Sequence, residues 1–282
     1  MKIGVSGASG QLGRAVVAEL VRRRAAHSVV GISRTPERVQ DPAEGRHGDF
    51  DAPQSLVRAY EGLDRLLLIP SAELRPGLRG RQMKDAIDAA NRAGVKHLFL
   101  LSAAGTRQAA LPEMRETYWT AEQHLIKTAP TWTIMRMNYY AEMMAQEIQM
   151  SLGAGVLTGL GEERVAYISR DDLAVAAAGA LLSEGHAGAI YSVSGPAVVT
   201  GVDRAQIAAE LTGKPVQFAV ITKAQFRDGL AQAKLPPEIV EAMVEIKHSF
   251  VAGAFDIVSG DAERLAGRKP RALREVLAAT LT

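Results

Sequence analysis

The chain has 282 residues, of which 47% are hydrophobic and 23% charged, and its formal net charge is +2. This composition is typical of a water-soluble globular protein, and without a long basic run it argues against a nucleic-acid partner. The absence of cysteine excludes disulfides, thiolate nucleophiles and zinc–cysteine sites, and the scattered histidines form no H-x-x-x-H pair, so no metal site is expected. No apolar run approaches ~18 residues and no signal peptide is evident, so we expect a cytoplasmic protein that does not contact a membrane.

A glycine-rich turn joins the first predicted strand, residues 2–6, to the first predicted helix, residues 12–24. Gly7 permits the tight turn, Gly10 lets the backbone approach a pyrophosphate, and Gly13 lets the helix pack against the strand. The N–H groups and the dipole at the helix N-terminus favour an anion at the same place. An ordinary strand–helix turn is the alternative, but the strand–turn–helix context predicts dinucleotide binding. The residues assigned to the cofactor here are Gly7, Ser9, Gly10, Gln11, Leu12 and Gly13.

The end of the second predicted strand, residues 28–33, indicates which nicotinamide cofactor is bound. NAD-specific proteins usually carry an acidic residue there, which binds the ribose 2′-hydroxyl. Here Arg34 follows the strand directly and Arg38 comes shortly after it. A guanidinium pairs with a 2′-phosphate, whereas a carboxylate would repel it, so the sequence favours NADP(H). A solvated surface arginine is the alternative interpretation of Arg34.

Strand and helix patterns continue to alternate along the chain. Helices are predicted over residues 53–61, 81–93 and 113–128, and strands over residues 66–69, 95–101, 131–136 and 189–193. This alternation predicts an α/β fold, a Rossmann doubly wound parallel sheet. Ligands bind at the carboxyl ends of the strands in such sheets. The predicted strand ends are Ser6, Ser33, Ile69 and Ser102, and Asp49 and Phe50 are expected near the adenine.

From about residue 195 the pattern changes to short amphipathic helices separated by prolines. These helices are predicted over residues 203–211, 223–234, 238–248 and 271–281. We therefore expect a dinucleotide-binding domain of residues 1–135, completed by about residues 163–195. The remaining residues, 136–162 and 196–282, should form a smaller, mainly helical lobe that binds the substrate.

The ordered set of motifs resembles the NmrA-like branch of the atypical short-chain dehydrogenase/reductases. The set comprises the glycine motif, Arg34-x-Pro36-x-x-Arg38, and the tracts 136–142, 167–174 and 191–195. Within that branch the chain is similar, nearly end to end, to bacterial NADPH-dependent quinone oxidoreductases and triphenylmethane-dye reductases. The resemblance implies a Rossmann domain with a small helical C-terminal lobe, the pyrophosphate on the glycine motif and the 2′-phosphate on Arg34. It also implies a nicotinamide end lined by Ile69, Pro70, Ser71, Ser102, Ala103, Asn138, Tyr139 and Tyr140.

The chain departs from the Tyr-x-x-x-Lys motif with which typical members of the superfamily donate a proton. Tyr118 is followed at that spacing by Glu122, a carboxylate in place of the positive charge of lysine. An alcohol-dehydrogenase mechanism is therefore not expected. The favoured interpretation of Tyr118 is a partly exposed helix residue.

Hydride transfer to a quinone or another conjugated acceptor does not need this dyad, because the acceptor delocalises the incoming electrons and a proton can come from water or a nearby hydroxyl. We therefore expect an NADPH-dependent reductase of a small aromatic or quinone-like substrate, as a monomer or homodimer. Ser102 and Tyr140 are the candidate catalytic hydroxyls. The methionine- and tyrosine-rich segment 137–144 suits either plain core or a pocket wall, the latter with Tyr139, Tyr140 and Trp119. The alternative function is a non-catalytic regulator that senses NADP(H).

Overall fold

The computed structural model describes residues 1–23, 28–75, 77–108 and 114–281. The chain forms two compact units, each built from three stretches. The sheet unit comprises Met1–Met137, Arg170–Tyr191 and Glu263–Arg268, and the small unit comprises Asn138–Ser169, Ser192–Ala262 and Lys269–Thr282. The predicted helix ends at Arg24 and Glu113 lie outside the described residues.

The sheet unit is built on a seven-stranded sheet with the strand order β3-β2-β1-β4-β5-β6-β9. Its strands are β1 (Lys2–Ser6), β2 (Ser28–Ser33), β3 (Glu44–His47), β4 (Arg65–Leu68), β5 (His97–Ala103), β6 (Trp132–Met137) and β9 (Ala189–Val193). Neighbouring strands from β3 to β6 pair in parallel. The chain order reverses between β1 and β4, which is the switch point at which such folds bind ligands. The predicted Rossmann-type fold is therefore confirmed.

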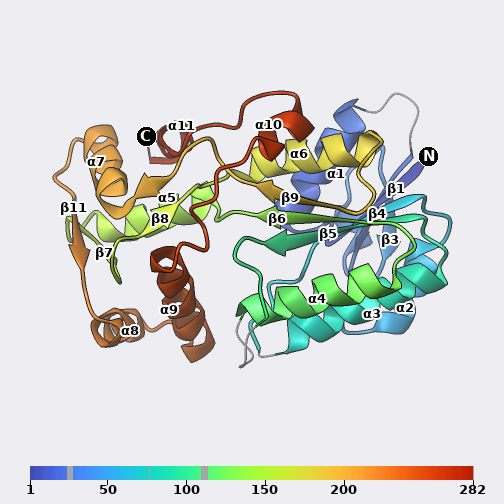
Figure 1. Cartoon of the computed structure of the whole chain (residues 1–282), viewed down its shortest axis with the longest axis horizontal. Helices are drawn as coiled ribbons and strands as arrows, with labels where there is room; N and C mark the ends of the chain where they lie inside the picture. Colours follow the sequence, from blue (N-terminus) through green and yellow to red (C-terminus); the bar gives the residue numbers. More distant parts are fainter. Residues whose placement is uncertain (24–27, 76, 109–113, 282) are drawn as a thin grey trace. The chain divides into compact units, whose positions relative to one another are not determined.

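Helices cover both faces of this sheet (Figure 1). On one face lie α1 (Gln11–Arg23) and α6 (Arg170–Leu182), and on the other α2 (Pro53–Tyr60), α3 (Leu78–Arg92) and α4 (Met114–Thr128). Leu66, Leu67 and Leu68 of β4 are fully buried, as an unbroken apolar run predicts for a parallel strand covered on both faces. The core under α2, α3 and α4 contains Leu56, Tyr60, Leu66, Leu68, Ile87 and Leu125.

The small unit is mainly helical. Its helices are α5 (Ala141–Ser151), α7 (Gly201–Thr212), α8 (Lys223–Gln232), α9 (Pro237–Val251) and α11 (Leu273–Leu281). Two pairs of short strands accompany them: β8 (Arg164–Val165) with β10 (Val199–Thr200), and β7 (Val156–Gly159) with β11 (Gln217–Val220). The sequence predicts a strand over residues 165–168, of which only Val165 lies in β8, and it does not predict the other three, because strands this short show too little alternation.

Most predicted elements are present, with shifted ends. β1, β2 and β9 have the predicted bounds, whereas β5 begins at His97 because the N–H of Val95 is bonded in the turn after α3, to the carbonyl of Ala90. The short helices η1 (Pro36–Arg38) and α10 (Asp261–Ala266) were not predicted. In the part of the chain that the structure describes, no helix is both long and apolar enough to cross a bilayer.

Candidate functional site

The turn after β1 requires glycine at two positions for reasons internal to the chain. Gly7 has a φ of +89°, in the left-handed region, and its N–H donates to the carbonyl of Ile32 at 2.9 Å. A Cβ on Gly13 would lie 2.2 Å from the carbonyl oxygen of Gly7, so only glycine lets α1 pack this closely against the turn. These are the tight-turn and helix-packing roles that the sequence predicts for the two residues.

Gly10 differs from them, because a Cβ there would meet only the Gly7 carbonyl oxygen, at an ordinary contact distance of 3.4 Å. Gly10 and Gln11 are exposed, Ser9 is half-buried and Leu12 is buried. The first turn of α1 has no acidic residue, so its own side chains do not neutralise the positive end of the helix dipole. The turn therefore fits a pyrophosphate, since the backbone at Gly10 is exposed and no described residue other than Gly7 would contact a Cβ there.

The end of β4 lies directly against this turn. The N–H of Ile69 donates to the carbonyl of Ser6 at 3.2 Å, and a Cβ on Gly7 would lie 3.2 Å from the carbonyl oxygen of Ile69. Ile69, Pro70 and Ser71 are half-buried. The structure thus places the first of the residues assigned to the nicotinamide end beside the glycine turn.

Hydrogen bonds connect the loops that follow β3 and β4. Ser71 Oγ donates to Gln82 Oε1 at 2.5 Å, and Gln82 Nε2 donates to Asp51 Oδ1 at 2.7 Å. The N–H of Asp51 donates in turn to Asp49 Oδ1 at 3.0 Å. Asp49 and the half-buried Phe50 therefore lie on a loop tied to Ser71, directly after the end of β3.

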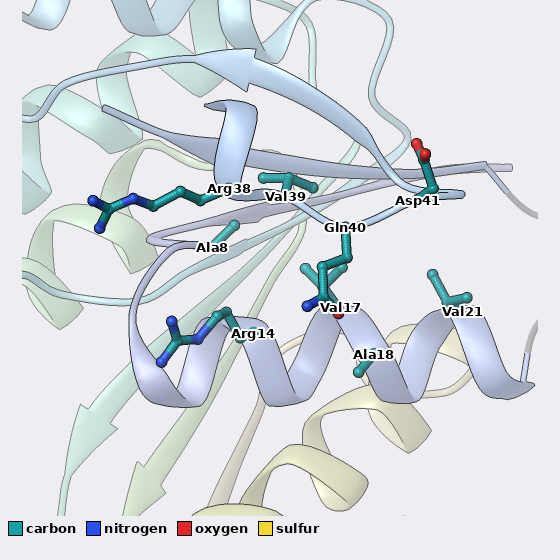
Figure 2. Close-up of a pocket in the computed structure, with 9 residues that line it drawn as sticks. All are labelled: Ala8, Arg14, Val17, Ala18, Val21, Arg38, Val39, Gln40 and Asp41. Atoms are coloured by element: carbon teal, nitrogen blue, oxygen red, sulfur yellow. The ribbon is translucent and has the colours of Figure 1, made fainter. Parts of the chain in front are cut away.

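A pocket of about 190 Å³ lies between α1 and the segment that follows η1 (Figure 2). It is lined by Ala8, Arg14, Val17, Ala18, Val21, Arg38, Val39, Gln40 and Asp41. Figure 2 shows the side chains of Arg14 and Arg38 extending toward the same end of the pocket, beside the glycine turn, with Asp41 at the other end. Both arginines are exposed, and neither forms an ion pair with an acidic residue in the described ranges. Two unpaired guanidinium groups beside this turn suit a phosphate.

Arg34, the 2′-phosphate ligand implied by resemblance, is also exposed, directly after β2, but it does not line this pocket. Sequence analysis did not identify Arg14. Its signal is its position, because Arg14 follows Gly13 within the first turns of a helix that begins at a glycine turn. The pocket therefore adds Arg14 to the cationic residues that the sequence singled out.

Ser102 and Arg136 are paired across β5 and β6 and share the carboxylate of Glu122 from α4. Ser102 Oγ donates to Glu122 Oε1 at 2.5 Å, while Arg136 bonds both oxygens, Nε to Oε1 at 2.9 Å and Nη2 to Oε2 at 2.6 Å. Glu122 is fully buried, and its hydrogen bonds raise the pKa of Arg136. Ser102 is fully buried, next to the half-buried Ala103, and its Oγ also lies 3.3 Å from Thr106 Oγ1, so the role of Ser102 toward a ligand stays a prediction.

Tyr118 is buried, at 9% exposure, so the interpretation as a partly exposed helix residue was wrong. Its hydroxyl oxygen accepts a hydrogen bond from Nη1 of Arg79 at 3.2 Å. Arg79 lies in the first turn of α3 and is 7% exposed. The sequence did not indicate this pair, because the two residues are separated by 39 positions and come from different helices.

Asn138, Tyr139 and Tyr140 belong to the small unit and make contacts within it. Asn138 Nδ2 donates to the carbonyl of Phe255 at 3.0 Å, and the ring of Tyr139 meets that of Phe250 edge-on at 5.0 Å between centroids. Tyr140 is the residue before α5 and is half-buried. The Asn138 amide and one edge contact of Tyr139 are thus used within the unit, and the roles of these three residues toward a ligand stay predictions.

Comparison with known proteins identifies the family. Residues 7–184 match a family described as NAD(P)H-binding. The chain is 31% identical over 251 residues to quinone oxidoreductase 2 of Escherichia coli strain K12, covering 86% of each protein. Its fold is similar to those of an E. coli NADPH-dependent quinone oxidoreductase complexed with NADPH (TM-score 0.93, 27% identity) and Citrobacter sp. triphenylmethane reductase complexed with NADP(H) (TM-score 0.91, 27% identity). Both of these structural matches cover 99% of this chain and 100% of the other. The resemblance drawn from the motifs is therefore confirmed, and the chain belongs to the NAD(P)H-binding, NmrA-like family of oxidoreductases.

Proposed function

We propose that this protein is an NADPH-dependent reductase that transfers hydride to a quinone or a similar conjugated aromatic or carbonyl acceptor. The cofactor supplies the hydride when it is bound. The observation that carries the choice of NADPH is the arrangement of Arg14 and Arg38 at one end of the pocket beside the glycine turn. Guanidinium groups stabilise a 2′-phosphate, and Asp41, the one acidic residue among those that line the pocket, lies at its other end.

The acceptor class is supported by the two kinds of relatives. One is named a quinone oxidoreductase and another a triphenylmethane reductase, and quinones and triphenylmethane dyes are both conjugated molecules. The protein must hold such an acceptor against the nicotinamide at ~3–3.5 Å and keep bulk water out. In this proposal Tyr140 packs against the ring of the acceptor. Ser102 stays the second candidate hydroxyl for orienting the carbonyl of the acceptor, as the sequence predicts.

The same proposal assigns cofactor binding and substrate binding to different parts of the chain. Residues 1–135, with about residues 163–195, form the cofactor-binding domain, and residues 136–162 and 196–282 form the lobe that binds the substrate. The protein acts as a monomer or homodimer on a small aromatic or quinone-like molecule, and we propose neither a nucleic-acid partner nor a membrane contact. Gel filtration of the purified chain tests the oligomeric state.

Mixing the purified protein with NADPH and menadione tests the function. We expect loss of the NADPH absorbance in proportion to the menadione reduced, with NADH giving a slower reaction. A matched sample that contains NADPH but no acceptor controls for slow oxidation by oxygen. Tight binding of NADPH without its consumption, with menadione and with an aromatic dye, would contradict the proposal and favour a non-catalytic NADP(H) sensor.

A further inference from the structure

Arg79 is a buried cation that has no acidic partner among the residues that the structure describes. Its side chain is 7% exposed, and Nε is buried without a hydrogen-bond partner. Its one hydrogen bond to a described residue runs from Nη1 to the Tyr118 hydroxyl, and the guanidinium carbon lies 5.5 Å from the centre of the Tyr118 ring. Burying a guanidinium without a carboxylate is costly, since neither a hydroxyl nor an aromatic face carries a full negative charge. The free Nε is therefore suited to an oxygen atom that a ligand brings.

Tyr118 has a proton to donate. A guanidinium has no lone pair, so Arg79 must be the donor in this bond and the Tyr118 oxygen the acceptor. The phenolic proton must then point elsewhere, and no residue within the described ranges accepts it. Arg79 and Tyr118 are both buried and together present an N–H donor and an O–H donor for which no described residue is an acceptor.

Arg79 and Tyr118 lie toward the carboxyl edge of the sheet, which is the edge where ligands bind in such folds. Tyr118 lies one helical turn before Glu122, on the same face of α4, and Glu122 is bonded to Ser102 near the carboxyl end of β5. A helix that follows a parallel strand begins at the carboxyl edge of the sheet, so Tyr118 lies further out toward that edge than Glu122. Arg79 reaches it from the first turn of α3, and a Cβ on Gly80 would lie 3.5 Å from the carbonyl oxygen of Thr117.

From this geometry we infer that Arg79 and Tyr118 bind the oxygen of the electron acceptor and protonate it during reduction. The inference rests on the proposed reductase function. The acceptor takes two electrons with the hydride, and negative charge gathers on its oxygen. The Tyr118 O–H bond breaks as the O–H bond of the reduced acceptor forms, and Arg79 holds the phenolate that remains. Tyr118 then recovers a proton from water, so the balance is one acceptor, one NADPH and one proton in, and one reduced acceptor and one NADP⁺ out.

In this arrangement the positive charge beside the tyrosine comes from an arginine on a neighbouring helix, and not from a lysine one turn further along the same helix. At the lysine position of the Tyr-x-x-x-Lys motif the chain has Glu122, whose carboxylate is occupied by Ser102 and Arg136. The positive charge beside the tyrosine comes from Arg79 instead. This pair selects acceptors with an oxygen that becomes anionic, and it gives no help to an acceptor that is itself a cation.

Two acceptors separate this role from a structural one. Menadione needs a proton on oxygen, whereas crystal violet, a triphenylmethane cation, takes hydride at carbon to give a neutral product without a proton. We expect Tyr118→Phe and Arg79→Met each to lower kcat/KM for menadione by about 100-fold, as loss of a general acid does. For crystal violet the same variants should change kcat/KM by less than about threefold, since that reaction has no such step. Arg79→Lys, which keeps the charge, should recover part of the menadione activity.

Arg81→Met is the matched control, because Arg81 is exposed on the same helix and its loss changes the net charge equally. Titration with NADPH and thermal melting of each variant report whether the cofactor site and the fold are intact. Equal losses with both acceptors, or no loss with either, would show that Arg79 and Tyr118 are structural and overturn the inference. If the wild-type protein reduces crystal violet alone, the inference fails while the reductase function stands. If it binds NADPH and reduces neither acceptor, the proposed function fails.

Discussion

Removing the arginines near the glycine turn should change the cofactor preference. Arg14 and Arg38 extend toward the same end of the pocket, and Arg34 follows β2. None of the three is paired with an acid among the residues that the structure describes, so each guanidinium is available to a phosphate. We therefore expect Arg38→Ala and Arg34→Ala to weaken NADPH binding strongly and NADH binding little, with Arg14→Ala acting in the same direction.

The magnitude follows from the kind of contact. A hydrogen bond to a charged group contributes about 1.5–3 kcal/mol net, which corresponds to about 10–100-fold in affinity. NADPH should therefore bind about 10–100-fold more tightly than NADH, and losing one phosphate contact should erase most of that ratio. Higher ionic strength should reduce the preference as well, because exposed charges are screened by salt.

Dissociation constants for NADPH and NADH, measured by fluorescence titration at fixed ionic strength, give the ratio for each variant. Arg92→Ala is the control, since Arg92 is an exposed cation in the last turn of α3, at the end of the helix away from the carboxyl edge of the sheet. Equal affinities of the wild-type protein for the two cofactors would refute the reasoning. A ratio that falls only in Arg34→Ala would show that the 2′-phosphate lies outside the pocket in Figure 2.

Three further predictions concern the glycine turn, the acceptor and acid stability. Gly10→Val should abolish NADPH binding in titrations with little change in melting temperature, because a Cβ at residue 10 has room in the protein. Gly13→Val should instead lower the melting temperature. Unchanged NADPH affinity in Gly10→Val would show that the turn is misassigned. Tyr140→Ala should lower kcat/KM for menadione by about tenfold, with NADPH affinity little changed. Tyr140→Phe should have a kcat/KM near that of the wild-type protein if Tyr140 acts by packing. An unchanged kcat/KM in Tyr140→Ala would show that the acceptor binds elsewhere. Burial and the charge of Arg65 lower the pKa of His97 to about 4, so unfolded chains bind the proton first as pH falls from about 6.5. The contribution of His97 to the free energy of unfolding should therefore be fully present above pH ~6.5. It should decline by about 1–2 kcal/mol as the pH falls toward ~4, a range reduced because His97 is partly exposed to solvent. In denaturant melts, the free energy of unfolding of His97→Phe should fall less steeply over that pH range than that of the wild-type protein. An equally steep fall would show that His97 does not cause the pH dependence.

The sequence by itself determined the features that depend on neighbours along the chain. The glycine turn could be predicted because a strand, three glycines and a helix are contiguous, and the burial of β4 because its apolar run is unbroken. The class of cofactor, a nicotinamide dinucleotide, followed from the same stretch, whereas the preference for NADP(H) drawn from the absence of an acid at the end of β2 stays a prediction. The ordered motifs also identified the family, which the comparisons confirm.

Side-chain partners from distant positions were decided by the tertiary structure alone. Glu122 was interpreted as a missing lysine, yet its carboxylate bonds Ser102 and Arg136, and the charge beside Tyr118 comes from Arg79. Periodicity indicates which face of a helix is buried, but not which side chain of another helix meets it. Helix packing brings Arg79 to Tyr118 across 39 positions and buries both, and only the fold shows that Arg79 Nε has no hydrogen-bond partner among the described residues. The sequence assigns different roles to Gly13 and Gly10, and the fold adds the steric reason: a Cβ on Gly13 would lie 2.2 Å from the carbonyl oxygen of Gly7, whereas a Cβ on Gly10 would meet that oxygen at 3.4 Å.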